Sequence, residues 1–494
     1  MYPLSHTLHV VCLWVLFSTY TATATGICTT LASLLPNRVA FPGDGAYNAS
    51  TASYAYANQQ TQRPSCIVRP SSTADVSLVV KSLREAPQVP FAIRSGGHAT
   101  NRGFSNIDGS VTVDLTSINA VRVREDGVTV SIGTGATWGD VYPVLDARKR
   151  SLNGGRASNV GVGGLLSGGG IGFFALQYGF ACDAVVNMEV VLATGAVVNA
   201  NEKSNRDLFI ALKGGQNNFG IVTRFDITTI PQGQIWGGGV VYPDSTTAAQ
   251  IDAFTHWKTP RNFDPASSVE QSHVYIGAQQ LWLVSNLLAY AKPTPFPENL
   301  RNFTAIQPQM ISSLRVTNVT DLANEIQSQS TPNQYTIFAT TTIRNSPTIL
   351  TKVHSLWKSS VGQMTRNNAT ITSSLTLQSI PAPPSNPSRT NILGFDPSSN
   401  PQKDLVLVLC SSFWDDPAVG GQVETAVQGF ITGVENTAKQ QGLLHRFRYP
   451  NYAAARFQEP LESTGNLDEL RRVARKYDPA GMFQRQVIGG WKLY

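Results

Sequence analysis

Apolar positions recur along the first part of the chain at two spacings, one typical of helices and one typical of strands. Four valine and leucine residues share one helix face within residues 74–85, and the apolar run 89–94 predicts a buried strand. Short strands are predicted at 111–115, 120–123 and 128–132, the last from its alternation. This succession of helices and strands predicts an α/β or α+β first lobe.

An amphipathic helix is predicted to begin at Trp138. Thr137 is suited to its N-cap because Asp140, an acidic residue, follows three positions later. Residues 184–199 divide into two β-rich halves about a Thr-Gly pair, which predicts a hairpin. A short helix is expected at 207–212.

Glycine clusters become rarer in residues 236–446. Strand-like segments lie there between longer loops, at 281–288, 335–343 and 405–409. The proline-rich stretch 381–387 predicts an exposed loop. We therefore expect a separate domain built on an antiparallel sheet, with helices covering one side.

The composition is that of an ordinary globular protein. The 494 residues, of which 41% are apolar and 14% charged, are enough for two or three domains that each bury a core. The net charge of +6 is spread along the chain, and its densest run, 471–476, fits the solvated face of a helix at 467–476. We therefore expect no nucleic-acid partner. The sequence does not indicate an oligomeric state.

The N-terminal residues have the pattern of a secretory signal. The apolar run 8–17 is too short to span a bilayer, and the small residues Ala22 and Ala24 follow it. We expect a signal peptide at 1–24, with cleavage near Ala24; the alternative is a buried N-terminal helix. No later apolar run has the length of a membrane helix.

Secretion would expose the cysteines to an oxidising environment. We expect Cys28 and Cys66, which flank the start of the first domain, to form a disulfide, and Cys182 and Cys410, in apolar surroundings, to remain buried thiols. No spacing of cysteines and histidines suits a metal. Sequons for N-glycosylation agree with secretion and lie at Asn48, Asn302, Asn318 and Asn368.

Two glycine-rich stretches contain the candidate chemistry. The first, FAIRSGGHATNRGFS at 91–105, turns through glycines and presents His98; the second, GVGGLLSGGGIG, covers 161–172. Glycines allow backbone N–H groups to converge on an anion such as a pyrophosphate. On residues alone, His98 is a nucleophile, a proton carrier or a turn residue. The chain has no strict G-x-G-x-x-G, Walker A, HExxH or G-x-S-x-G motif.

Together the two stretches resemble the flavin domain of the vanillyl-alcohol-oxidase, or PCMH-type, superfamily, and more closely its berberine-bridge-enzyme-like branch of FAD-linked oxidoreductases. The resemblance runs from about Cys66 to Thr229 and resumes near Asn451. It implies an α+β protein with a two-lobed FAD-binding domain and a substrate domain. The expected order is an N-terminal segment at 25–60, the FAD-binding domain at 61–235, the substrate domain at 236–446 and a return to the FAD domain at 447–494.

The resemblance also implies a set of cofactor-binding residues. The family's histidine is bonded to the 8α-methyl group of FAD, and His98 matches it. The phosphates would lie between residues 94–97 and 161–169. At Gly163, Gly164, Gly168 and Gly169 we expect any side chain to collide with the cofactor. The expected cofactor-binding residues are Arg94, Ser95, Gly96, Gly97, His98, Ala99, Gly163, Gly164, Gly168, Gly169, Ile221 and Asn451.

Two further positions refine this prediction. Many family members carry a second flavin link to a cysteine, but Ala157 stands at the matching position, so the resemblance implies one covalent bond. The family places a tyrosine in an Asn-Tyr pair, which matches Tyr452 and makes it the expected catalytic proton acceptor. Asn451 would orient Tyr452 or contact the flavin.

The resemblance thus implies an FAD oxidoreductase that takes a hydride from a small organic molecule and passes electrons to O2, giving H2O2. The N-terminal signal pattern adds the expectation that this enzyme is secreted. A weakly charged, fairly hydrophobic substrate domain favours a secondary-metabolite alcohol, amine or ring precursor. The alternatives are a carbohydrate oxidase of the same family and a secreted binding protein that keeps the fold without redox chemistry.

Overall fold

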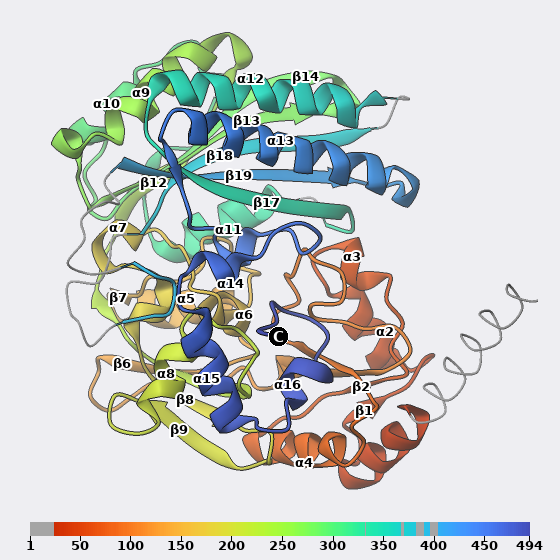
Figure 1. Ribbon diagram of the computed structural model, residues 1–494. Coiled ribbons are helices and arrows are strands. Elements are labelled where there is room, and N and C mark those ends of the chain that lie inside the picture. The colour runs from red at the N-terminus through yellow and green to blue at the C-terminus, as the bar shows by residue number, and fades with distance from the viewer. Residues whose placement is uncertain (1–23, 331, 367–369, 382–389, 396–403) are drawn as a thin grey trace, which may run out of the picture.

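The computed structural model describes residues 24–330, 332–366, 370–381, 390–395 and 404–494. Most of the expected signal peptide, the sequon at Asn368 and the proline-rich loop beyond Pro381 lie outside these residues. In the described residues the chain has the predicted α+β architecture, with a four-stranded and a five-stranded sheet below a large antiparallel one (Figure 1). Two further short strands, Arg150–Ser151 and Ile230–Pro231, pair with each other.

The first lobe is a four-stranded sheet in the order β1-β2-β4-β3, in which β4 runs parallel to β2 and β3. The predicted helix is α4, which is N-capped by the Ser72 hydroxyl and buries its apolar face. Elements of this lobe are β1 (Val39–Ala40), α2 (Gly45–Ala52), α3 (Ala57–Gln60), β2 (Cys66–Val68), α4 (Thr73–Arg84), β3 (Phe91–Arg94) and β4 (Val111–Asp114).

The second lobe is a five-stranded antiparallel sheet in the order β5-β6-β10-β8-β9. Its strands are β5 (Val121–Val123), β6 (Thr129–Gly133), β8 (Val185–Val191), β9 (Val197–Asn201) and β10 (Ile221–Thr228), and its other elements are α5 (Trp138–Asp146), β7 (Arg150–Ser151), α6 (Val162–Ser167), α7 (Ala175–Tyr178), α8 (Arg206–Leu212) and β11 (Ile230–Pro231). The predicted cap of α5 is present, since the Asp140 carboxylate accepts hydrogen bonds from the N–H and hydroxyl of Thr137. The predicted hairpin is β8–β9.

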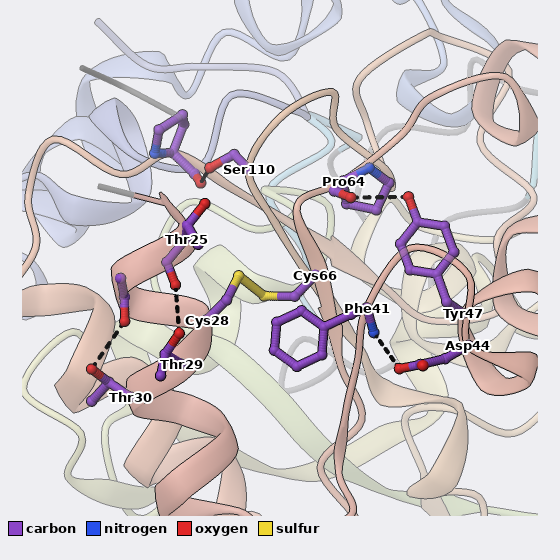
Figure 2. The surroundings of a disulfide bond; sticks show 12 residues. Thr25, Cys28, Thr29, Thr30, Phe41, Asp44, Tyr47, Pro64, Cys66 and Ser110 are labelled. Carbon is purple, nitrogen blue, oxygen red and sulfur yellow. Dashed lines mark hydrogen bonds between the residues drawn. A yellow bond between two sulfur atoms is a disulfide. The ribbon is translucent and has the colours of Figure 1, made fainter. Parts of the chain in front are cut away.

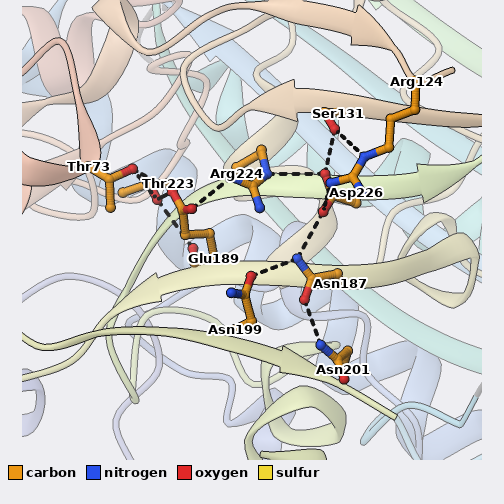
Figure 3. Close-up of polar contacts among 10 residues, drawn as sticks. All are labelled: Thr73, Arg124, Ser131, Asn187, Glu189, Asn199, Asn201, Thr223, Arg224 and Asp226. Carbon is orange, nitrogen blue, oxygen red and sulfur yellow. Dashed lines mark hydrogen bonds and ion pairs between the residues drawn. The ribbon is translucent and has the colours of Figure 1, made fainter. Parts of the chain in front are cut away.

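A polar network on one face of this sheet joins the two lobes (Figure 3). On β10, Arg224 bridges Glu189 and Asp226 with N–O distances of 2.7 and 3.1 Å. Glu189 also accepts a hydrogen bond of 2.5 Å from the Thr73 hydroxyl, at the start of α4. The Asp226 carboxylate also forms an ion pair with a second arginine, Arg124, at an N–O distance of 2.7 Å. Because these bonds lower the pKa of both carboxyl groups, the network is charged at neutral pH.

The third sheet has nine strands, all paired antiparallel, in the order β15-β12-β14-β13-β18-β19-β17-β20, with β16 also paired to β12. Helices α9, α12 and α13 cover one face, and the two lobes lie under the other (Figure 1). The strands are β12 (Ile235–Pro243), β13 (Ser267–Ile276), β14 (Leu281–Tyr290), β15 (Ile311–Ser312), β16 (Arg315–Thr317), β17 (Tyr335–Arg344), β18 (Ile371–Ser379), β19 (Leu405–Trp414) and β20 (Leu444–His445), and the helices are α9 (Thr247–Trp257), α10 (Arg301–Thr304), α11 (Val319–Ser328), α12 (Pro347–Met364) and α13 (Gly420–Gln440).

Strand alternation gives this sheet two different faces. Val269, Ile337 and Cys410 pack into the core beneath the helices. Their neighbours Glu270 and Phe338 point the other way and line a cavity between the sheet and the lobes.

The last part of the chain returns to the first lobe. Its helices are α14 (Pro460–Ser463), α15 (Leu467–Tyr477) and α16 (Met482–Arg485). The Phe91 N–H donates to the Gln486 carbonyl at 2.8 Å, and the Phe91 ring meets Phe483 edge-on at 6.5 Å. The C-terminal residues are therefore part of the core under the first glycine-rich loop. The exact domain boundaries stay a prediction.

The predicted disulfide joins Cys28 to Cys66, with Cα atoms 6.0 Å apart (Figure 2). It ties the N-terminal helical segment to the start of β2. Cys182 and Cys410 are free and buried, as expected. Within the described residues, the helices fall short of the length and apolar character that a membrane span requires.

Candidate active site

A cavity of about 450 Å³ lies between the nine-stranded sheet and the two lobes. Both glycine-rich stretches, β10, the sheet face and residues 449–452 contribute to its wall. Ten of the predicted site residues line it: Ser95, Gly96, Gly97, His98, Ala99, Gly163, Gly164, Ile221, Asn451 and Tyr452. Arg94, Gly168 and Gly169 are not among the lining residues.

The two glycine-rich stretches touch each other at one wall of the cavity. A Cβ added to Gly96 would lie 2.5 Å from the Cα of Gly161, so neither position has room for a side chain. The Ser95 hydroxyl donates to the Thr134 carbonyl at 2.7 Å and accepts from the Gly163 N–H at 3.2 Å. Direct packing of loop against loop therefore requires these small residues.

The expectation that a cofactor excludes side chains at four positions of the second stretch needs correction. A Cβ at Gly163 would collide with Thr134, and one at Gly168 would collide with Asn451. Gly169 has a positive φ of +112° and packs against Leu393. At these three positions the protein itself excludes a side chain. Only Gly164, of the four, has no neighbouring atom within 4 Å.

The wall of the cavity has the donors that a dinucleotide requires. No described residue accepts a hydrogen bond from the backbone N–H of Gly96, Gly97 or Ala99, although all three line the cavity. Gly164 leaves open space on the opposite loop. Convergent free N–H groups favour phosphate oxygens, so these residues fit the diphosphate of FAD.

The Arg94 side chain does not line the cavity and is buried among residues of the first lobe. Its guanidinium lies 3.5 Å from the Asp114 carboxylate, and both side chains are almost fully buried. It also donates to the Ser50 carbonyl at 2.6 Å and to the Ser53 hydroxyl at 2.7 Å, and it stacks over the Tyr54 ring. Arg94 thus anchors the N-terminal segment to β3.

His98 lies deep in the molecule with one side open to the cavity. Burial lowers its pKa to about 4, and the nearby Asn159 amide acts in the opposite direction. The Tyr56 ring meets the imidazole edge-on at 5.1 Å. His98 is therefore neutral near pH 7, the state in which a ring nitrogen is a nucleophile. Ala157 also lines the cavity, whereas neither free cysteine of the described part does.

Tyr452 ends a short 3-10 turn, Pro450–Tyr452, that brings its phenol to the cavity. Its oxygen accepts a hydrogen bond of 2.7 Å from Nη2 of Arg156. Nη1 of Arg156 lies 2.7 Å from the Glu270 carboxylate and donates to the Gln378 amide oxygen at 2.9 Å. Burial raises the pKa of Tyr452, and Arg156 opposes that rise.

Asn451 acts on a different tyrosine from the expected one. Its Nδ2 donates to the Tyr449 hydroxyl at 3.0 Å and to the Leu165 carbonyl at 3.1 Å. The Tyr449 hydroxyl also accepts from the Gly170 N–H at 2.9 Å. Asn451 therefore links the Asn-Tyr pair to the second glycine-rich stretch. The hydroxyl of Tyr452 is bound by Arg156 instead.

Sequence reasoning missed several residues of the site: Tyr56, Arg156, Glu270, Phe338 and Gln378. Arg156 could have been found, because it directly precedes Ala157 in a stretch already singled out. Glu270 and Phe338 come from strands far along the chain, and no local pattern connects them to the glycine-rich loops. The described residues hold no group of three or more His, Cys, Asp or Glu placed to bind a metal.

Comparisons with known proteins agree with this site. Residues 64–201 match the family described as FAD binding domain. The chain is 36% identical over 479 residues to the FAD-dependent monooxygenase sdcF of Emericella nidulans, covering 94% of this chain and 98% of that relative. It is 34% identical over 471 residues to the FAD-dependent monooxygenase tpcD of Cochliobolus heterostrophus, covering 91% and 88% of the two chains.

Solved structures share the fold at low identity. 6-Hydroxy-D-nicotine oxidase from Arthrobacter nicotinovorans matches with a TM-score of 0.75 at 20% identity, covering 92% of this chain and 97% of that one. The BBE-like 1 protein of Physcomitrella patens matches with a TM-score of 0.76 at 19% identity, covering 93% and 98%. The chain therefore has the fold of these two structures, and it belongs to the family of FAD-dependent oxidoreductases that includes the two monooxygenases described above.

Proposed function

We propose that this FAD-dependent oxidoreductase holds its flavin through one covalent bond, to His98, and oxidises a hydrophobic organic small molecule. FAD, when bound, would supply the acceptor for a hydride from carbon and the route by which two electrons reach O2, giving H2O2. Tyr452 takes the proton that leaves the substrate hydroxyl or amine as the hydride departs. The substrate thus loses two electrons and two hydrogens.

The observation that carries this proposal is that His98 and Tyr452 line one cavity whose walls also fit the FAD diphosphate. Tyr56 lies against His98, and the Phe338 ring lies 6.0 Å from Tyr452. These aromatic side chains, with Leu409, suit a secondary-metabolite alcohol, amine or ring precursor better than a sugar. Ala157 supports a single bond because it offers no thiol.

Denaturation in acid tests the bond. We expect the purified protein to be yellow and its acid precipitate to keep the flavin in the pellet. His98→Ala should release the flavin into the supernatant, because the nucleophilic nitrogen is gone. The matched control is His256→Ala, at an exposed histidine outside the cavity lining, which should retain it. Flavin that stays bonded in His98→Ala would mean that another residue is the anchor.

Oxygen insertion is the second candidate, because the two curated relatives described above are named FAD-dependent monooxygenases. The two reactions differ in where the O2 atoms go. An oxidase should release one H2O2 for each substrate molecule and place no label from isotopic O2 in the product. A monooxygenase, given two electrons by an added reduced nicotinamide, should place one labelled oxygen atom in the product and one in water.

We also propose that the protein is secreted and glycosylated. The disulfide between Cys28 and Cys66 supports an oxidising route, and Asn48, Asn302 and Asn318 are exposed. Expression with the native N-terminus should give protein in the medium that begins near residue 25 and loses mass on treatment with an N-glycosidase. Protein retained in the cell at full length would contradict this proposal.

A further inference from the structure

Arg156 makes the contact that distinguishes Tyr452 from the other tyrosines at the cavity. Its guanidinium donates to the Tyr452 oxygen at 2.7 Å, and the described residues include no other cation within hydrogen-bond distance of that oxygen. An arginine has five N–H donors and no acceptor. The Tyr452 oxygen must therefore be the acceptor in this bond, and its own proton is directed to some other group.

The guanidinium is held in place by two strands of the large sheet. Glu270 on β13 and Gln378 on β18 are direct cross-strand partners, and both reach the same nitrogen of Arg156. The side chains of Arg156 and Glu270 are only 10% and 18% exposed. A buried arginine with two fixed acceptors on Nη1 has little freedom to turn, so Nη2 stays on Tyr452.

We propose that Arg156 is a positioning residue for Tyr452, with Glu270 as its counter-charge. Arg156 holds the phenol by its oxygen and leaves the phenolic proton free to depart through the cavity to solvent water. It then stabilises the resulting phenolate, which accepts a proton from substrate. Glu270 fixes the guanidinium and limits the positive charge that Tyr452 experiences. This inference rests on the proposed role of Tyr452 as the proton acceptor.

Every ionisable neighbour of Tyr452 enters the expected result. Arg156 is the cation beside it, and Glu270 is the carboxylate behind that cation. Tyr449, whose ring lies 4.8 Å away, and Tyr56, whose ring neighbours Phe338 as that of Tyr452 does, are buried phenols with raised pKa values and are neutral at working pH. The two charges therefore act on the Tyr452 phenol in opposite directions.

A pair of variants tests the proposal by the direction of a pKa shift. In protein labelled with ¹³C at the tyrosine Cζ, the Tyr452 resonance is identified as the one lost in Tyr452→Phe. Arg156→Met should raise the pKa of Tyr452 by about 1 to 3 units, because the cation is lost and Glu270 remains. Glu270→Gln should lower it, because Arg156 then lacks its counter-charge. A purely structural role would not produce shifts of opposite sign.

Three controls keep the result interpretable. Arg156→Lys retains the charge without the planar fork and should give a pKa between those of wild type and Arg156→Met. Arg124→Met removes an arginine from the network of the five-stranded sheet and should leave Tyr452 unchanged. If Arg156→Met does not fold, Arg156→Lys and Glu270→Gln still give the two directions.

An unchanged Tyr452 pKa in folded Arg156 variants, or shifts of the same sign in Arg156→Met and Glu270→Gln, would overturn the inference. The measurement needs neither substrate nor turnover. Acid precipitation tests the flavin bond separately, so opposite shifts in a protein that releases its flavin would reject the covalent bond and keep the role of Arg156.

Discussion

Individual glycines in the two loops differ in what excludes a side chain. At Gly163 the obstacle is the protein, because an added Cβ would collide with the Thr134 hydroxyl. At Gly164, which lines the cavity, the added atom would meet nothing within 4 Å. Neighbouring glycines of one motif can therefore have different reasons to be glycine, one in folding and one in binding.

This difference predicts that alanine impairs folding stability at one position and FAD binding at the other. Gly163→Ala should lower the thermal unfolding midpoint, because overpacking a fitted contact costs about 1–3 kcal/mol. Gly164→Ala should leave the apoprotein as stable as wild type and weaken FAD binding, because its methyl group occupies space near the cofactor. Thermal unfolding of the apoprotein and FAD titration distinguish the two. Equal unfolding midpoints and equal FAD affinities in both variants would contradict the assignment.

Tyr452 is the residue on which turnover should depend most. Tyr452→Phe removes the proton acceptor and keeps the ring, so flavin reduction should slow by about 100-fold or more. Stopped-flow bleaching of the flavin, with a substrate found to reduce the wild type, measures this rate. Tyr275→Phe is the control, because Tyr275 lies on β13 outside the cavity lining. An unchanged rate in Tyr452→Phe would remove this tyrosine from the mechanism.

Among the elements, the short helix α16 shows how the end of the chain supports the site. The Asp478 carboxylate accepts hydrogen bonds from the N–H groups of Met482 and Phe483, at 2.9 and 2.7 Å. This cap seats Phe483 against Phe91, at the start of the strand that leads into the His98 loop. The pair Asp478-Pro479 therefore acts through packing beneath the loop.

Loss of this cap should destabilise the protein. Asp478→Ala leaves two buried N–H groups without acceptors, which should cost about 1–2 kcal/mol. Chemical denaturation, followed by circular dichroism, measures the free energy of unfolding. Asp468→Ala, at a side chain that is 99% exposed near the start of α15, should change it little. Equal losses in the two variants would show that the cap has no specific effect.

Across the protein, one buried and one half-buried histidine link stability to pH. His273 on β13 and His354 on α12 lie 4.5 Å apart between ring centroids. Burial lowers the pKa of His273 to about 3 and that of His354 to about 4. Lys358 lowers both values further and Asp244 raises both. The contact between α12 and the sheet is therefore built for neutral imidazoles.

The sign of the pH effect follows from the unfolded value of 6.5. Below that pH the unfolded chain binds protons that the folded chain does not, so stability is present above about pH 6.5 and is lost as the pH falls toward 4 and 3. Thermal unfolding midpoints measured from pH 7.5 to pH 4.5 should fall in wild type. The fall should be smaller in a folded His273→Leu, His354→Leu double variant; an equal fall would assign the effect to other groups.

Much of the architecture followed from local patterns. The apolar spacing predicted α4, the alternation predicted β6, and the Thr-Gly pair predicted the β8–β9 hairpin, because these elements bury faces that the sequence itself defines. The cap of α5 was predicted because it depends on two residue types three positions apart. The Cys28–Cys66 disulfide was predicted because both cysteines flank the start of the first domain and an oxidising setting was expected.

The site was determined in part by motif and in part by folding. Glycine and His98 mark the first loop in any reading of the sequence, because few residue types allow a turn that presents backbone donors. The neighbours of Tyr452 carry no such mark. More than a hundred residues separate Arg156 from Glu270, and Glu270 from Gln378. Only strand pairing and the alternation of the sheet bring Glu270 and Gln378 to the same nitrogen of Arg156.

The glycines also show what the sequence alone does not determine. A run such as SGGG indicates that side chains are excluded, but it does not say by what. The fold supplies the answer at Gly168, where Asn451 fills the space, and at Gly169, where Leu393 does. Residue type is a local property that a sequence records directly. The identity of the excluding neighbour is a long-range packing relation, which exists only once distant segments have come together.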